Sequence, residues 1–473
     1  MISYIIRLLI SFSFLTYIVD ADVHPIVIHG HFFIDNVTKE PFYVKGIDYQ
    51  PGGSSGFSPD KDPLSDPAQC ARDIVLFQEL GINTVRIYSI NSQLNHDKCM
   101  TMLAKAGIYL VLDVNSPMPQ HHLNRYEPWT TYNLYYLENI FKIVEQFSWY
   151  NNTLAFIAGN EIVNDPISAS VSAPYIKAVV RDLKLYISKH SPRQVPVGYS
   201  AADDLNYRIS LAKYLECYYD DVNEAIDFYG VNSYQWCGDQ TFYSSGYSIL
   251  VNDYKSFTKP VFFTEYGCNE VLPRNFDEVP ILYTNDMIDV FQGGLIYEFS
   301  QEPNNYGLVE VLPDGDINIL RDFLQLKTKY DSLPNLDYNF ILESMKVNAQ
   351  EINEKIRKYK TSVPRCDERY LNLDISKGVP ASFGEILIDC GVSATRGKYV
   401  DLSTQEMTSQ FRYYLNGEPF DISPVIDTIF EFSAGDVERR QEVETKEKED
   451  NAFKTMVHKV SDSIKSFCNN LFN

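Results

Sequence analysis

The sequence predicts an α/β fold, a (β/α)8 barrel followed by a small C-terminal β-rich module. From residue 40 to about 330, short apolar, β-branched or aromatic runs alternate with longer stretches of helical period, which is typical of repeated βα units. Eight such units fit a closed barrel of parallel strands. The full length of 473 residues exceeds what a single core usually occupies, so we also expect a second, smaller module.

The eight strands are expected at 42–49, 83–90, 109–114, 153–160, 195–202, 225–234, 260–267 and 293–300. Helical segments between them include 70–81, 96–107, 136–150 and 175–190. An open, doubly wound sheet is the alternative arrangement of βα units. It would normally carry a glycine-rich phosphate turn after its first strand, and GGSSG at 52–56 lacks both that spacing and the lysine of a P-loop.

The chain ends are expected to differ from the barrel, which we place at 22–331. Residues 1–21 are apolar, with Arg7 near the start and a small-residue pattern at Val19 and Ala21, which predicts a secretory signal peptide. After the barrel we expect a helical connector at 332–361, the β-rich module at 362–433 and a charged, flexible tail at 434–473. The strand-like segments of the module are 385–392, 397–402, 411–417 and 428–434.

Charge and cysteine content limit the class of protein. A formal charge of −22 would repel nucleic acid and anionic membrane surfaces, so neither is expected as a partner. No second long apolar run follows residue 21, which predicts no membrane span. Eight cysteines in an exported chain indicate disulfide bonds, and Asn36 and Asn151 stand in glycan-acceptor sequences.

Two glutamates stand where the fourth and seventh strands of the barrel should end. Glu161 follows the apolar run 153–160, and Glu265 closes the run VFFTE. The active site of such a barrel lies at the carboxyl ends of its strands, so the two side chains should face each other. One such glutamate alone could be a structural ion pair. Two predict cleavage of a glycosidic bond, with retention of configuration if the carboxyl groups lie about 5–5.5 Å apart.

The neighbouring residues suggest which glutamate does what. Asn160 can donate to a sugar 2-hydroxyl, a contact that strengthens in the transition state. A carboxyl that acts as an acid needs a raised pKa, which burial would provide, whereas one surrounded by hydrogen-bond donors stays ionised and can attack. We therefore assign Glu161 as acid/base and Glu265 as nucleophile, and the reverse assignment stays open from the residues alone.

Several longer motifs carry a family resemblance. YQPGGSSG, LNHDKCM, VPVGYSAADD, GNEIVND, NSYQWCG, FFTEYGCN and GGLIYEFSQEPNNYGLVEV resemble the fungal β-1,3-glucanosyltransferases of glycoside hydrolase family 72, the glycolipid-anchored surface proteins that remodel the yeast cell wall. The resemblance implies the same roles for the two glutamates. It also implies that glucan is bound by Gln50, Tyr88, Asp113, Asn160, Tyr234 and Tyr297.

The resemblance bears on the cysteines and on the chain ends as well. Cys237 and Cys268 follow strands six and seven, so a bridge would brace the loops beside Glu265. Cys70 and Cys99 correspond to another bridge of the family, and Cys217 is expected to pair with Cys366. Few cysteines lie beyond the barrel, so the cysteine-rich carbohydrate-binding module of some members is expected to be absent. The C-terminus lacks the apolar tail of a glycolipid anchor signal, which makes a lipid anchor doubtful.

The function expected from this resemblance is transfer between β-1,3-glucan chains at the cell surface or wall. The enzyme would cleave one glucan internally and pass the new reducing end to the non-reducing end of another. A plain retaining endo-glucanase and a wall protein that only binds glucan are the alternatives. No cofactor is required, no metal is expected at His121 and His122, and we expect a monomer.

Overall fold

The computed structural model describes residues 23–53, 56–337, 339, 363–435 and 437. The expected signal peptide, most of the helical connector and most of the charged tail lie outside these ranges. The described residues therefore cover the barrel and the segment that follows the connector.

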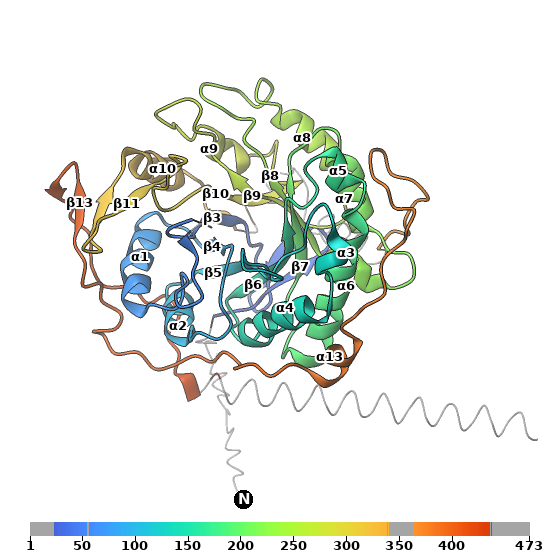
Figure 1. The fold of residues 1–473 in the computed structure, drawn as a ribbon. Coiled ribbons are helices and arrows are strands. Elements are labelled where there is room, and N and C mark those ends of the chain that lie inside the picture. Colours follow the sequence, from blue (N-terminus) through green and yellow to red (C-terminus); the bar gives the residue numbers. More distant parts are fainter. Residues whose placement is uncertain (1–22, 54–55, 338, 340–362, 436, 438–473) are drawn as a thin grey trace, which may run out of the picture.

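Eight parallel strands close into a barrel, and helices surround it (Figure 1). Each strand pairs with its neighbours in chain order, and the last pairs with the first. The predicted (β/α)8 barrel is confirmed. Its strands are β3 (Val44–Asp48), β4 (Thr84–Ile87), β5 (Tyr109–Asp113), β6 (Thr153–Asn160), β7 (Val197–Ala202), β8 (Phe228–Asn232), β9 (Val261–Tyr266) and β10 (Phe291–Ile296).

The strands are mostly apolar because they are covered on both faces. Every residue of β5 is buried, and so are the first seven residues of β6. Two glycines allow neighbouring strands to approach closely. A Cβ atom at Gly46 would lie 2.1 Å from the carbonyl oxygen of Thr84, and one at Gly293 would lie 2.0 Å from that of Val44. Any larger side chain at these two positions would force the strands apart.

The expected helices form, with ends set by local signals. Asp66 caps α1 by accepting hydrogen bonds from the amides of Ala68 and Gln69, and a proline occupies its first position. Asn133 caps α4 in the same way. The helices of the outer layer are α1 (Pro67–Glu79), α2 (Asp97–Lys105), α3 (Pro128–Thr131), α4 (Leu134–Phe147), α5 (Pro166–Ala169), α6 (Ala173–His190), α7 (Arg208–Glu216), α8 (Tyr247–Tyr254), α9 (Glu278–Leu282) and α10 (Arg321–Asp331), with a short 3-10 turn η2 (Val222–Glu224).

A hairpin of β1 (Ile26–His29) and β2 (Phe32–Asp35) lies at the amino ends of the barrel strands. The Phe33 ring packs against the rings of Phe228 and Phe262, with centroids 6.3 and 5.7 Å apart. Those two residues stand at the beginnings of β8 and β9. The hairpin therefore closes one end of the barrel, and the carboxyl ends of the strands remain as its open mouth.

The C-terminal sheet is shared with the barrel chain. Its order is β11 (Val309–Val311), β12 (Ile317–Ile319), β13 (Tyr413–Leu415) and β14 (Glu418–Pro419), so two strands precede the connector and two follow it. The expected small C-terminal sheet is present, and the expected strand at 411–417 contains β13. The domain boundaries stay a prediction.

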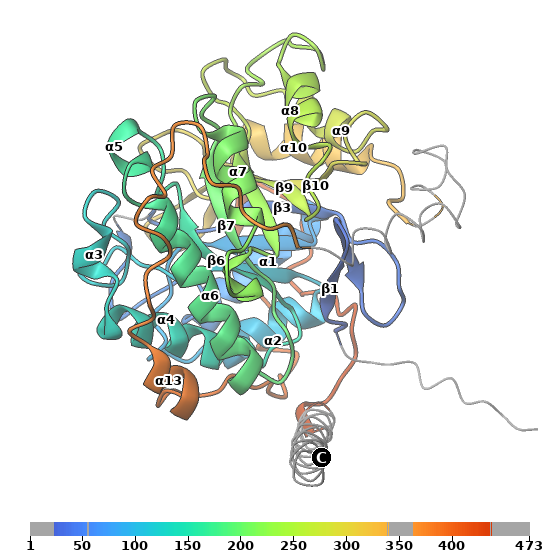
Figure 2. The same cartoon turned by 90° about the vertical axis from the view of Figure 1, so that its right-hand side faces the viewer.

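Three expected strands of the C-terminal segment are wrong. Residues 385–392 contain the helix α13 (Glu385–Cys390), and neither 397–402 nor 428–434 pairs as a strand. These segments lie on the barrel helices, where barrel groups satisfy part of their backbone. The imidazole of His190 in α6 hydrogen-bonds the carbonyl of Ile388, and the amide of Ile429 donates to the carbonyl of Lys105 in α2. Figure 2 shows α13, in orange, beside the end of α6. Strand-like composition therefore marked segments that pack on helices.

Candidate active site

The two glutamates lie at neighbouring parts of the barrel mouth. Glu161 directly follows β6, and Glu265 is the second-last residue of β9. Asn232 ends β8 and is the register partner of Glu265. Because carboxyl ends of parallel strands meet at one edge, these three side chains converge at the mouth, as the sequence predicted for the two glutamates.

Three hydrogen-bond donors surround the Glu265 carboxylate. The Tyr88 hydroxyl donates to Oε1 at 2.9 Å, and the Tyr234 hydroxyl donates to Oε2 at 2.8 Å. Nη1 of Arg86 lies 3.2 Å from Oε1. Glu265 itself is only 8% exposed. Both carboxylate oxygens are therefore fixed before any substrate binds.

The ionisation of this cluster follows from burial and charge. Burial raises the pKa of Glu265 above its ordinary value, and the negative charge of Glu161 acts in the same direction. The Arg86 guanidinium and the two tyrosine hydroxyls oppose this rise. Burial also raises the pKa of Tyr88 and of Tyr234, so both hydroxyls keep their protons and can donate.

Glu161 has a more open environment. Its Oε1 accepts one hydrogen bond, at 2.9 Å, from the amide nitrogen of Asn232. The same nitrogen donates to Oδ1 of Asn160 at 3.0 Å. The Asn232 carbonyl oxygen accepts from the hydroxyls of Ser200 and Thr264, which fixes the direction in which its NH2 group points. Glu161 is only half-buried, so burial does not mark it as the acid, and the more buried carboxyl is Glu265.

Arg86 and Asn232 are the site residues that sequence reasoning missed. Arg86 is fully buried in β4 and forms a bidentate ion pair with Asp113, at 2.9 and 3.0 Å. The sequence did carry a signal for this ion pair. An arginine lies inside a predicted buried strand, and an aspartate ends the next strand, and buried charges in proteins are usually paired. Asn232 had a similar signal, since an amide ends the apolar run FYGVN.

Asp113 and Gln50 have protein partners in this structure. Both oxygens of Asp113 accept from Arg86, so this carboxylate holds the group that contacts Glu265. Oε1 of Gln50 accepts hydrogen bonds from the backbone amides of Tyr88 and Ser89, at 3.2 and 3.1 Å. Any glucan contacts of these two residues stay predictions. The structure does place both beside the residues that surround Glu265.

Tyrosine rings form one side of the mouth. The Tyr234 ring packs edge-on against Tyr297 and Tyr306, with centroids 6.3 and 5.7 Å apart, and Tyr297 meets Tyr306 at 5.1 Å. On the other side, a groove of about 850 Å³ is lined by Tyr88, Asp113 and Asn160 together with residues of the loop after β5. The site therefore continues from Asn160, beside Glu161, into a groove with both polar and apolar lining residues.

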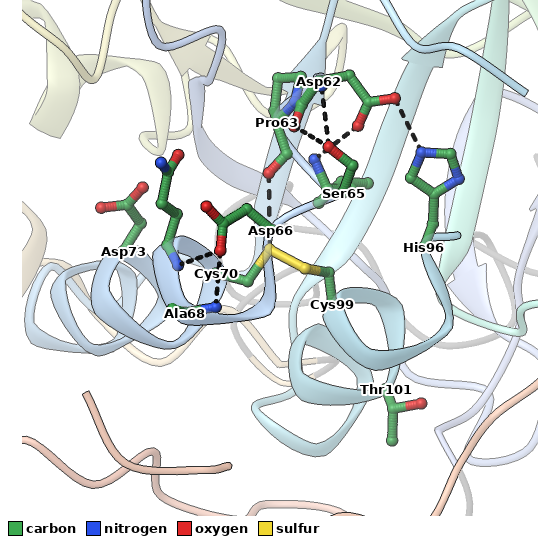
Figure 3. The surroundings of a disulfide bond; sticks show 12 residues. Asp62, Pro63, Ser65, Asp66, Ala68, Cys70, Asp73, His96, Cys99 and Thr101 are labelled. Carbon is green, nitrogen blue, oxygen red and sulfur yellow. Dashed lines mark hydrogen bonds and ion pairs between the residues drawn. A yellow bond between two sulfur atoms is a disulfide. The ribbon is translucent and has the colours of Figure 1, made fainter. Parts of the chain in front are cut away.

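All three expected cysteine pairs are disulfide-bonded in the structure. Figure 3 shows Cys70 and Cys99 joining α1 to α2, beside the buried pair of His96 and Asp62, whose atoms lie 2.9 Å apart. Cys237 and Cys268 join the loops after β8 and β9, and Cys217 ties the end of α7 to Cys366. The first of these two pairs braces the chain that follows Tyr234 and Glu265.

The remaining expectations concern metal and glycans. Among the described residues, the one group with the spacing of a metal site is Cys237, Cys268 and Glu270, and its cysteines are already joined to each other. Asn36 is exposed in the turn after β2, and Asn151 is half-buried before β6. Attachment of glycans at these two positions stays a prediction.

The fold and the site define the class of protein. Two carboxylates at the ends of the fourth and seventh strands of a (β/α)8 barrel, one of them held by three donors, are the arrangement of a glycosidase-type enzyme that works with a pair of carboxyl groups. The chain belongs to the glucanosyltransferase family, glycoside hydrolase family 72, whose model matches residues 15–334.

Individual relatives agree with this family. The chain is 58% identical to the 1,3-beta-glucanosyltransferase GAS4 of Saccharomyces cerevisiae, covering 82% of this chain and 80% of that protein. It is 43% identical to the 1,3-beta-glucanosyltransferase gel2 of Aspergillus fumigatus, covering 84% and 81%.

Solved structures of Saccharomyces cerevisiae Gas2 are similar too. A mutant in complex with laminaritetraose and laminaripentaose is 38% identical, with a TM-score of 0.62 and coverage of 66% of this chain and 68% of that one. The mutant without ligand is 34% identical, with a TM-score of 0.65 and coverage of 74% and 71%. Among the described residues, no helix has the length and apolar character needed to cross a membrane.

Proposed function

We propose that this protein is a retaining 1,3-β-glucanosyltransferase that elongates one β-1,3-glucan with a segment cleaved from another. The observation that carries the proposal is the contrast between the two carboxylates. Glu265 is held on both oxygens by Arg86, Tyr88 and Tyr234, whereas Glu161 accepts a single side-chain hydrogen bond. A fixed, donor-surrounded carboxylate suits a nucleophile, and an accessible one suits a group that exchanges protons.

In the first step, a carboxylate oxygen of Glu265 attacks the anomeric carbon of a glucan bound across the mouth. The glycosidic bond breaks, and Glu161 gives its proton to the departing oxygen. The cleaved donor segment is then held as an ester on Glu265, through its new reducing end. Arg86 keeps the Asp113 carboxylate as a partner when the charge of Glu265 is lost in the ester.

In the second step, the 3-hydroxyl at the non-reducing end of another glucan attacks the same carbon. Glu161, now ionised, removes the hydroxyl proton while the ester bond to Glu265 breaks. A new β-1,3 bond forms, and both glutamates return to their starting states. Two inversions at one carbon give net retention.

The choice of glucan rests on the relatives. The similar curated proteins are named 1,3-beta-glucanosyltransferases, and one similar Gas2 structure contains laminari-oligosaccharides. We propose the same donor and acceptor here. The predicted glucan-binding residues line the mouth or support it, namely Gln50, Tyr88, Asp113, Asn160, Tyr234 and Tyr297.

Water is the competing acceptor, and it would make the same barrel an endo-glucanase. The test is to incubate purified protein with one reduced laminari-oligosaccharide of defined length and to measure product sizes over time. Products longer than the starting oligosaccharide are expected, because they require transfer. A ladder of shorter products alone would support hydrolysis, and no products at all would support a protein that only binds glucan.

We also propose that the protein acts at the cell surface or in the wall. Three disulfide bonds are typical of an exported protein, and they support this location. Cell fractionation with an antibody to the barrel should find the protein in the wall or medium, and recovery in the cytosol alone would contradict the proposal.

A further inference from the structure

A buried carboxylate beside the mouth has no part in the two steps described above. Glu298 follows Tyr297 directly after β10 and is only 3% exposed. The side-chain nitrogen of Asn304 donates to Oε1 of Glu298 at 2.8 Å and to the hydroxyl oxygen of Tyr297 at 3.2 Å. An amide carries two N–H donors, so Asn304 can serve both groups and thereby link Glu298 to Tyr297.

The backbone around this set is fixed independently. Nη1 of Arg274 donates to the carbonyl of Tyr297 at 2.8 Å, and Nη2 donates to that of Tyr306 at 2.6 Å. The orientation of the Tyr297 side chain is therefore what Glu298 and Asn304 determine.

The Tyr297 ring leads directly to the reacting carboxylate. It packs edge-on against Tyr234, with centroids 6.3 Å apart, and the Tyr234 hydroxyl donates to Glu265 at 2.8 Å. Tyr306 packs edge-on against both rings. A change in the direction of the Tyr297 ring would thus alter the mouth and the contact surface of the residue that holds Glu265.

Keeping a carboxylate ionised at this buried position costs free energy. Burial raises the pKa of Glu298 to about 7, and the charges that face it from Glu302 and Glu265 act in the same direction, while Asn304 and Tyr297 oppose them. Asp48, at the end of β3, also interacts with Glu298. A glutamine could accept from Asn304 without this cost, but it accepts that hydrogen bond less strongly than an ionised carboxylate does.

We propose that Glu298 is a positioning residue for the glucan site, which acts with Asn304 by fixing the hydroxyl and ring of Tyr297 beside Tyr234. This inference rests on the proposed glucanosyltransferase function. It assigns Glu298 no contact with the reacting atoms. Its effect reaches the substrate only through Tyr297, and this makes a double-mutant cycle the direct test.

The cycle compares wild type, Tyr297→Phe, Glu298→Gln and the double variant. We expect each single change to raise KM for a reduced laminari-oligosaccharide about three- to tenfold, the value of one hydrogen bond, with a smaller change in kcat. If Glu298 acts through the Tyr297 hydroxyl, the double variant should lie within about twofold of Tyr297→Phe. Effects that multiply in the double variant would overturn the proposal.

The pH dependence of KM gives a second readout that a merely structural role would not move. The ionised carboxylate accepts the hydrogen bond from Asn304 more strongly than the protonated form does, so wild-type KM should fall as pH rises through about 7. In Glu298→Gln this dependence should disappear. The same dependence in wild type and variant would overturn the proposal.

The matched control is Glu310→Gln, which removes an exposed carboxylate on β11 whose side-chain partner is Asn318. Its kinetics and melting temperature should equal those of wild type. Melting curves of all variants separate a local effect from loss of the fold. A wild-type protein that makes no products would contradict the proposed function instead, so the two failures are distinguishable.

Discussion

The two carboxylates at the barrel mouth differ in burial and in the number of hydrogen-bond donors around them. On the β9 side, Glu265 is buried and accepts hydrogen bonds from three side chains. These are Arg86 in β4, Tyr88 directly after β4, and Tyr234 after β8. On the β6 side, Glu161 is half-buried and has one donor, Asn232. With Glu161 as the acid, as we propose, burial alone does not identify the acid of this pair. The number of donors distinguishes the carboxylate that is held in place, Glu265, from the one that has fewer contacts, Glu161.

Removing either carboxylate should have the largest effect on activity. Glu161→Gln and Glu265→Gln are each expected to keep the fold and to lower turnover about 10⁴-fold or more, because each group acts in the same displacement. Turnover and melting temperature are the measurements. A variant of either kind with a near-normal rate and normal melting would contradict the assignment.

Azide can then separate the two sides of the mouth. With a substrate that has a good leaving group, azide should restore turnover of Glu161→Ala with retained configuration, since the ester on Glu265 still forms. It should not do so for Glu265→Ala. Rescue of the second variant with retained configuration would exchange the two roles.

A smaller effect is expected when one donor is removed from the β9 side. Tyr234→Phe deletes the hydroxyl that donates to Oε2 of Glu265, and we expect turnover to fall about 10²-fold. This hydroxyl holds the pKa of Glu265 down against burial, so its loss should raise that pKa further. The ionised nucleophile would then appear only at higher pH. The acid limb of the kcat/KM profile should move to higher pH, and an unmoved or lowered limb would break the comparison.

On the β6 side, Asn232→Ala should lower turnover about tenfold, because it removes the one hydrogen bond from a side chain to Glu161. The loss should shrink on a substrate whose leaving group needs no proton. Tyr234→Phe should show no such relief, since its defect lies in the attack on the anomeric carbon. Equal relief in both variants would mean that the two sides are not functionally distinct.

The last prediction concerns a buried carboxyl that affects stability and takes no part in catalysis. Glu278 begins α9, and burial raises its pKa to about 7 without any place at the mouth. Its folded pKa lies above the unfolded value, so its stabilising contribution is complete below about pH 4.5 and is lost as pH rises through about 7. The lost contribution is about 3 kcal/mol.

Glu278→Gln should therefore flatten the decline of melting temperature between pH 5 and pH 8 and leave kcat/KM unchanged. Thermal melts at several pH values test the first point, and the product assay tests the second. A decline as steep as in wild type would show that other groups dominate the pH dependence of stability.

Local patterns in the sequence predicted the barrel and its two glutamates. Strands buried on both faces are mostly apolar, and helices of the outer layer repeat at helical period, so both patterns were visible without any long-range information. Glu161 and Glu265 stood out because each ends such an apolar run. Position in the chain, by strand number, then placed them at one mouth.

The tertiary structure alone decided which side chains face those glutamates. Arg86 contacts a residue 179 positions away, and the Asn232 side chain lies on Glu161, 71 positions away, so no local pattern fixes either pair. The same reason explains the errors after the connector. The segment at 385–392 has the composition of a strand, but its contacts are with α6, and it forms a helix there. Composition determined which segments needed burial, and only the packed barrel determined what would bury them.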